Sequence, residues 1–363
     1  MTLITPTTRT ALVDHSIRLL LDGQAASGAI VASPAYATYR FAWLRDGSFC
    51  ADALDRFGHQ AASGRFHAWV CRTVIELRPR VEAAVLAISG GDPTTMLPTR
   101  FELDGREESG EEDWPNFQLD GYGTWLWAFA QHLGRASRDL TSAEREAVEL
   151  VARYLQAAGD QPCYDCWEEL VGHRHATTIG ACAAGLRAAA DMLQDNQFRV
   201  ASEELRQILE RDFVRAGGFV KHDDTDAVDG SLLWLALPFG VVRVDDVRFV
   251  RTVERIEAEL KVPAGGVRRY LGDTFYGGGE WVILTAWLGW GRQALGRRDE
   301  ALECLDWIES TATAALELPE QVTDRPLSPD HVGEWVRRWG PPATPLLWSH
   351  AMYLVLVDAL GLR

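Results

Sequence analysis

The chain has 363 residues, with 52 acidic and 36 basic side chains and a net charge of −16. This charge repels phosphate backbones and anionic lipid surfaces, so we expect no nucleic-acid partner and no membrane association. The first residues lack the basic and apolar segments of a secretory signal, and the six cysteines form no disulfide framework, which predicts a cytoplasmic protein with reduced thiols. The length and the lack of a linker predict a single domain over residues 1–363.

Apolar spacing and capping residues predict twelve helices and no strand. The helices span residues 8–22, 46–58, 61–78, 120–136, 141–159, 177–195, 198–214, 231–242, 246–260, 280–296, 298–313 and 346–361. The even-numbered helices are apolar nearly all round and therefore need burial on every side. The odd-numbered helices are amphipathic, and the fifth opens with the capping box Thr141-x-x-Glu144. Inner and outer helices thus alternate along the chain.

The links between the predicted helices alternate in length. Links after odd-numbered helices are long, on the order of 15 to 40 residues, whereas links after even-numbered helices are short. If neighbouring helices are antiparallel, every long link lies at the same end of the molecule. We therefore predict an all-α (α/α)6 barrel of six inner and six outer helices, with an active site formed by the long loops.

The first long loop ends in residues 36–46, YATYRFAWLRD. Asp46 can cap the second helix with Arg45 as a surface cation, or the two charges can grip adjacent sugar hydroxyls beside Trp43 and Tyr39. These two interpretations are compatible. In the second loop, residues 114–120 place an aromatic ring, an amide and a carboxylate directly before a buried helix.

The third loop carries residues 163–178, CYDCWEELVGHRHATT. Glu168 and Glu169 are either acids near a helix start or catalytic groups, because a neighbouring carboxylate and the apolar face of Trp167 would both raise the pKa of a catalytic acid. Two cysteines and two histidines in this stretch have the residue types of a zinc site, but their spacing fits no familiar zinc motif. We expect no bound metal.

The last two long loops add further candidates. Residues 266–281 contain a run of glycines, but no strand with a phosphate-binding fingerprint precedes it, which argues against a nucleotide site. Glu320 follows an outer helix at the end of the barrel that carries the long loops, where it can face Glu168. Glu334 lies on the same loop and is the alternative to Glu320 as a catalytic base.

Five motifs occur in order along the chain: YRFAWLRD, FQLDGYG, WEELVGHRHATT, RRYLGDTFY, and LPEQ followed by LLWSHA. Together they resemble glycoside hydrolase family 15, the glucoamylase family, over essentially the whole catalytic length. The resemblance implies an (α/α)6 barrel that hydrolyses terminal α-glucosidic bonds with inversion and without a metal or organic cofactor.

The resemblance also implies residue roles. Glu168 would be the general acid and Glu320 the general base, with Tyr39 beside the attacking water as a positioning group or auxiliary base. The substrate-binding residues would be Arg45, Asp46, Trp43, Trp114, Trp167, Glu169, Arg269 and Phe275.

One residue departs from the common family pattern. Phe275 stands where many members have a tyrosine that hydrogen-bonds the one equivalent to Tyr39, so we expect Tyr39 to ionise or shift more freely. Phe275 resembles the isomaltose-cleaving branch, and the 363 residues contain no starch-binding module, so a short α-glucoside is the expected substrate. We predict an exo-acting, inverting α-glucosidase that releases β-glucose from isomaltose.

Several alternatives stay open from the sequence. Within the family they are a glucoamylase acting on maltose or dextrin, and a trehalase. An (α/α)6 sugar epimerase would rely on paired histidines, for which His173 and His175 are the candidates, whereas a sugar-binding scaffold would need neither catalytic glutamate. The sequence indicates no oligomeric state and no role for Cys163 and Cys166.

Overall fold

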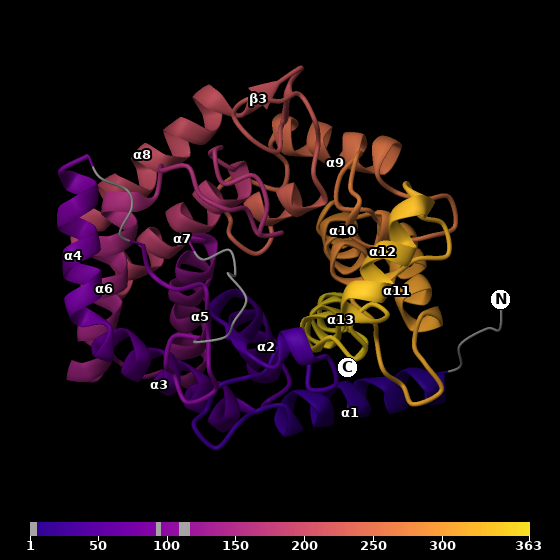
Figure 1. The fold of residues 1–363 in the computed structure, drawn as a ribbon, viewed down its shortest axis with the longest axis horizontal. Coiled ribbons are helices and arrows are strands. Elements are labelled where there is room, and N and C mark those ends of the chain that lie inside the picture. Colours follow the sequence, from indigo (N-terminus) through magenta and orange to yellow (C-terminus); the bar gives the residue numbers. More distant parts are fainter. Residues whose placement is uncertain (1–5, 92–95, 109–116) are drawn as a thin grey trace.

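The computed structural model describes residues 6–91, 96–108 and 117–363, and its helices form two concentric layers (Figure 1). In the inner layer each element contacts the next, and the last packs against the first. The inner elements are α2 (Leu44–Arg56), α5 (Asp120–Ala136), α7 (Ala176–Leu193), the 3-10 helix η2 (Gly230–Leu235), α10 (Val282–Ala294) and α13 (Leu347–Ala359). The outer helices are α1 (Pro6–Asp22), α3 (Gln60–Glu76), α6 (Ser142–Ala158), α8 (Asn196–Asp212), α9 (Val247–Glu259) and α11 (Arg298–Ser310). The predicted all-α barrel and its alternation of layers are confirmed.

The eighth predicted helix, at 231–242, is wrong in type and length. Its place in the inner layer is taken by η2, which ends at Leu235. Pro238 has no backbone N–H to donate and disfavours the helical conformation of Leu237 before it, so the chain cannot continue as an α-helix. Despite its shortness, η2 contacts both α7 and α10 and closes the ring.

Two helices were not predicted, α4 (Arg78–Ser89) and α12 (Pro329–Trp339). Each has a proline in its first turn, where the missing N–H costs nothing because it has no partner within the helix. α4 packs on the outer side of α6. α12 contacts the 3-10 turn η3 (Phe275–Gly277), so it lies within the long-loop region.

The expectation of no strand is also wrong, although the strands are short. β1 (Ala42–Trp43) pairs with β2 (Arg100–Phe101), β3 (Val214–Arg215) with β4 (Gly218–Phe219), and β5 (Glu280–Trp281) with β6 (Gln321–Val322), all antiparallel. Strands of two residues carry too little alternation to show in a sequence. β1 and β5 lead directly into α2 and α10, and they tie the starts of these inner helices to neighbouring loops.

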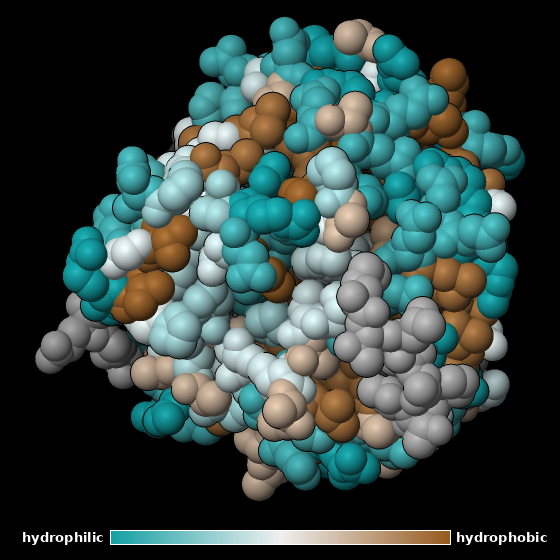
Figure 2. Space-filling model, turned by 90° about the vertical axis from the view of Figure 1, so that its right-hand side faces the viewer, coloured by the Kyte–Doolittle hydropathy of each residue, from teal (hydrophilic) through white to brown (hydrophobic). Residues whose placement is uncertain are grey.

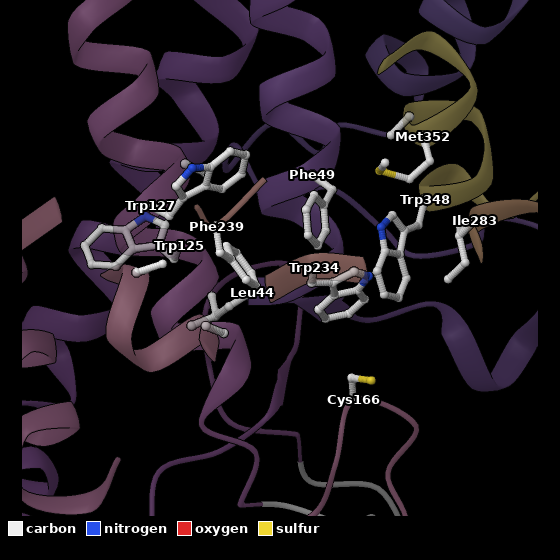
Figure 3. Close-up of a cluster of buried hydrophobic side chains, with 14 of the residues drawn as sticks. Leu44, Phe49, Trp125, Trp127, Cys166, Trp234, Phe239, Ile283, Trp348 and Met352 are labelled. Atoms are coloured by element: carbon white, nitrogen blue, oxygen red, sulfur yellow. The ribbon is translucent and has the colours of Figure 1, made fainter. Parts of the chain in front are cut away.

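An aromatic cluster fills the barrel beneath the long loops (Figure 3). Phe49 on α2 stacks on Trp348 of α13, with ring centroids 5.5 Å apart and an interplanar angle of 11°. Trp234 and Trp287 pack against both rings from η2 and α10. All four side chains are buried. Because close-packed aromatic rings leave no channel, the barrel is closed below this level.

The surface is mainly polar. On the face shown in Figure 2, hydrophilic residues predominate and hydrophobic ones form small separate groups. Among the described residues, no helix combines the length and apolar character needed to span a membrane.

Candidate active site

A cavity of about 500 Å³ opens at the end of the barrel where the inner helices begin. This volume is within the range of small-molecule sites. Ten of the predicted site residues line it: Tyr39, Trp43, Arg45, Asp46, Trp167, Glu168, Glu169, Arg269, Phe275 and Glu320. Trp114, the remaining predicted site residue, lies outside the described residues.

The cavity wall also contains residues that the predicted site did not include. Among them are Cys166, Trp281, Trp335, Arg338, Trp339 and Trp348. Three of these lie on α12, and their spacing as Trp335-x-x-Arg338-Trp339 is the helical signal that could have placed them on one face. Trp348 lines the cavity and stacks on buried Phe49, from which we infer that the cavity ends at this ring.

Glu168 lies at a turn that the chain holds in a left-handed conformation, with φ of +66°. For a residue with a side chain this conformation is uncommon and needs support from its surroundings. The side chain is fixed at one oxygen, because Oε1 accepts hydrogen bonds from Trp43 Nε1 at 2.7 Å and from Gln118 Nε2 at 2.8 Å. A proton on this carboxyl group therefore belongs on Oε2, where it can be donated.

Glu169 points to a different partner. Its Oε1 lies 3.0 Å from Arg269, and its Oε2 accepts a short hydrogen bond from Tyr270. Arg269 is buried and also binds both carboxylate oxygens of Asp273, with its Nε 2.7 Å from Oδ2. Its planar guanidinium is thus fixed by two carboxylates against the cavity wall.

Glu320 is buried and lines the same cavity, and nine loop residues separate it from the end of α11. Its Oε1 accepts a hydrogen bond from Tyr39 at 3.1 Å. Burial raises the pKa of Glu320 to about 8, although Tyr39 and Arg269 act in the opposite direction. α13 holds the loop in place, since Ser349 donates to the Pro319 carbonyl and His350 accepts from Leu318 N–H.

Tyr39 is a neutral hydroxyl donor in this arrangement. Burial and the nearby carboxylates of Glu320 and Glu168 raise its pKa well above the ordinary value. This raised pKa disfavours the ionised form of Tyr39. The ring of Phe275 offers no hydroxyl, and the neighbouring Tyr276 bonds to Tyr36 at 2.7 Å instead.

Arg45 and Asp46 lie together at the start of α2. Arg45 donates to Gln118 at 2.8 Å and to Asp120 at 3.2 Å, and its guanidinium lies 5.2 Å from the Trp348 ring centroid. Asp46 lies 3.3 Å from Arg45 Nε, and burial raises its pKa to about 6 while Arg45 acts to lower it. Asp46 is not the N-cap of α2, which is Trp43. Both side chains are held in place and largely shielded from water, which suits them to bind the hydroxyl groups of a neutral sugar.

The geometry bears on the sequence-based alternatives. Glu334 is exposed on α12, pairs with His331 and does not line the cavity. His173 and His175 are also absent from the cavity wall. Within the described ranges, the groups of side chains close enough to share a metal ion include neither Cys163 nor Cys166. Both thiols are free and buried, so these two cysteines form neither the zinc arrangement nor a disulfide.

The family model for glycosyl hydrolases family 15 matches residues 7–325. The chain belongs to this family. It is therefore a glycoside hydrolase, and the family prediction is confirmed.

Two related proteins support this assignment, and a third shares the fold. The isomaltose glucohydrolase of Kribbella flavida is 43% identical over 361 residues, covering 97% of this chain and 93% of that protein. A glycosidase variant solved in complex with glucose is 41% identical, with a TM-score of 0.94 and 98% coverage of both chains. The glucoamylase of Saccharomycopsis fibuligera shares the fold at 16% identity, with a TM-score of 0.79 and coverage of 99% of this chain and 96% of that one.

Proposed function

We propose that this protein is an exo-acting α-glucosidase that hydrolyses isomaltose with inversion and releases β-glucose. The observation that carries the proposal is a closed-ended cavity that presents two carboxyl groups, Glu168 and Glu320, on its wall. A cavity that ends on Trp348 accepts the end of a sugar chain and excludes its middle. The similarity to an isomaltose glucohydrolase supports the α-1,6 linkage.

In the proposed reaction, Glu168 protonates the glycosidic oxygen from Oε2 as the bond to the anomeric carbon breaks. Glu320 removes a proton from a water that attacks the opposite face of the ring. One proton is given and one is taken, so the sum of the reaction is the addition of water. The raised pKa makes the ionised form of Glu320 a stronger base, and it also means that this form becomes abundant only as the pH approaches about 8.

The remaining residues of the proposed site bind and orient the glucose unit. Arg45 and Asp46 hold hydroxyls at the inner end of the cavity, beside the face of Trp348. Tyr39 donates to Glu320 and thereby positions the base and its water. Arg269 and Glu169, which pair with each other, also line the cavity.

The proposal also concerns the domain organisation and the cellular location of the enzyme. We infer a single catalytic barrel domain that acts in the cytoplasm on a small α-glucoside without a cofactor. The six free, buried cysteines agree with a reducing compartment.

Proton NMR of fresh reactions with isomaltose, maltose, kojibiose, nigerose and trehalose tests the proposal. Initial β-glucose from isomaltose, with slower cleavage of the other sugars, is the expected result. Initial α-glucose would contradict the inverting scheme, and faster cleavage of maltose or trehalose would replace the substrate by one of the two family alternatives. Binding without turnover would favour the sugar-binding scaffold.

A further inference from the structure

A buried cation lies behind the loop that carries Glu168. Lys221 follows β4 and is 5% exposed. Its Nζ lies 2.9 Å from Asp165 Oδ2 and 2.7 Å from Asp229 Oδ2, and 3.9 Å from the ring centroid of Tyr270. Both aspartates are buried as well. Lys221 does not line the cavity, so it cannot touch the substrate there.

Asp165 holds the turn that contains Glu168. Its Oδ1 accepts backbone hydrogen bonds from Trp167 and Glu169, each at 2.9 Å. Its carbonyl oxygen accepts the backbone N–H of Glu168 at 2.9 Å, and its own N–H donates to the Glu169 carbonyl. These four bonds close the turn around the left-handed conformation of Glu168.

Asp229 fixes the side chain of Trp167 in the same loop. Its two carboxylate oxygens accept from Trp167 Nε1 at 3.2 and 3.0 Å, and Oδ1 also accepts from the backbone and hydroxyl of Ser231 at the start of η2. Lys221 therefore joins the two carboxylates that fix the backbone and the indole of the loop. The Lys221 carbonyl additionally accepts the N–H of Ala176, the first residue of α7.

We propose that Lys221 is a positioning residue for catalysis, which gives Asp165 and Asp229 a shared positive charge between them and so holds the Trp167–Glu169 turn in its reactive geometry. The inference rests on the proposed roles of Glu168 and Glu169. A buried carboxylate without a counter-charge takes up a proton or moves toward water, and either change removes hydrogen-bond acceptors from this turn. Glu168 then loses the support for its left-handed backbone and turns away from the glycosidic oxygen.

Both charges are present at neutral pH. Burial lowers the pKa of Lys221, but the two aspartates outweigh it and the net pKa is raised. For Asp165, burial raises the pKa, but Lys221 outweighs it and the net pKa is lowered. The ion pair between Lys221 and Asp165 therefore holds at neutral pH.

The test compares two substrates in Lys221→Met. Isomaltose needs a proton on its leaving oxygen, whereas α-glucosyl fluoride releases fluoride and depends far less on a general acid. We expect kcat/KM for isomaltose to fall about 100-fold, as for a misplacement of a catalytic group by roughly 1 Å, and kcat/KM for the fluoride to fall less than about tenfold. A loss of folded protein would lower both rates equally.

Arg292→Met is the matched control. Arg292 is also a buried cation, paired with Glu257 at 2.7 Å, but it lies in the last turn of α10 at the far end of the barrel. We expect this variant to lose thermal stability without changing the ratio of the two rates. If Lys221→Met does not fold, Asp229→Asn replaces it in the test, because asparagine has nearly the same shape as aspartate. In this variant the ratio of kcat/KM for isomaltose to kcat/KM for the fluoride should also fall, but by a smaller factor.

The outcomes separate the two proposals. A wild type that does not cut isomaltose contradicts the proposed function, and the ratio is then measured with the disaccharide it does cut. An active wild type whose Lys221→Met and Asp229→Asn variants lose both rates equally, or lose neither, overturns the positioning role of Lys221.

Discussion

Replacing Glu320 by glutamine should abolish turnover and, above neutral pH, make the protein more stable. Burial raises the pKa of Glu320 from 4.5 to about 8. Between these pH values the folded protein keeps a proton that the unfolded chain releases. The stability that this proton contributes is therefore complete below about pH 4.5 and is lost as the pH rises through 8.

The size of the effect follows from the same pKa values. At about 1.4 kcal/mol for each pH unit between them, the ionised Glu320 costs the fold up to about 5 kcal/mol at pH 9. Glutamine is neutral at every pH and can still accept the hydrogen bond from Tyr39. The variant and the wild type should thus be similar near pH 5, and the variant should be more stable by several kcal/mol at pH 9.

Urea unfolding followed by tryptophan fluorescence between pH 5 and pH 9 measures this difference. Glu334→Gln is the control, because Glu334 is exposed and its replacement should change stability by the same small amount at every pH. A stability gap for Glu320→Gln that does not widen with pH would refute the burial argument. Loss of turnover in Glu334→Gln, with activity retained in Glu320→Gln, would refute the assignment of the base.

Three further results are expected. In the wild type, the pH dependence of kcat/KM should contain an ionisation near pH 8 that belongs to Glu320. Tyr39→Phe should move this ionisation to higher pH, because the Tyr39 hydroxyl lowers the pKa of Glu320. pH–rate profiles of both proteins measure the shift, and an unmoved ionisation would mean that it does not belong to Glu320. Glu168→Gln should lose nearly all turnover of isomaltose but still bind glucose, and calorimetry would measure this binding. Turnover at the wild-type rate would mean that Glu168 is not the general acid. Arg45→Lys should raise KM about tenfold with little change in unfolding temperature, since lysine keeps the charge but loses the planar fork; an unchanged KM would mean that Arg45 does not grip the sugar.

The barrel was predictable because its layers differ in composition. Helices such as α10 and α13 are apolar on all sides, whereas α6 and α9 have one apolar face, and this contrast survives uncertainty at the helix ends. The short elements were not predictable for a physical reason. η2 and the two-residue strands are held by tertiary contacts, which local propensity does not encode.

The site was predictable in its residue types and only partly in its contacts. The motifs placed Glu168 and Glu320 on the long loops and Arg45 where the first long loop enters its helix, and the structure gathers all three in one cavity. The hydrogen bond from Gln118 to Glu168 joins two different loops, and no sequence spacing could have indicated it. The same holds for Lys221, which lies 53 positions from Glu168 in a segment without any recognisable motif.

The aromatic floor beneath Trp348 also bears on the order in which products depart. Because Trp348 stacks on buried Phe49, we infer that arrival and departure use the same opening of the cavity. Hydrolysis of isomaltose gives two glucose molecules, and the one from the non-reducing end should rest against this floor, behind the one that has just been detached from it. The detached sugar must diffuse away first, and the glucose at the inner end of the cavity leaves last. Glucose should consequently compete with incoming substrate for the empty enzyme, and its accumulation should slow the reaction without lowering the maximal rate.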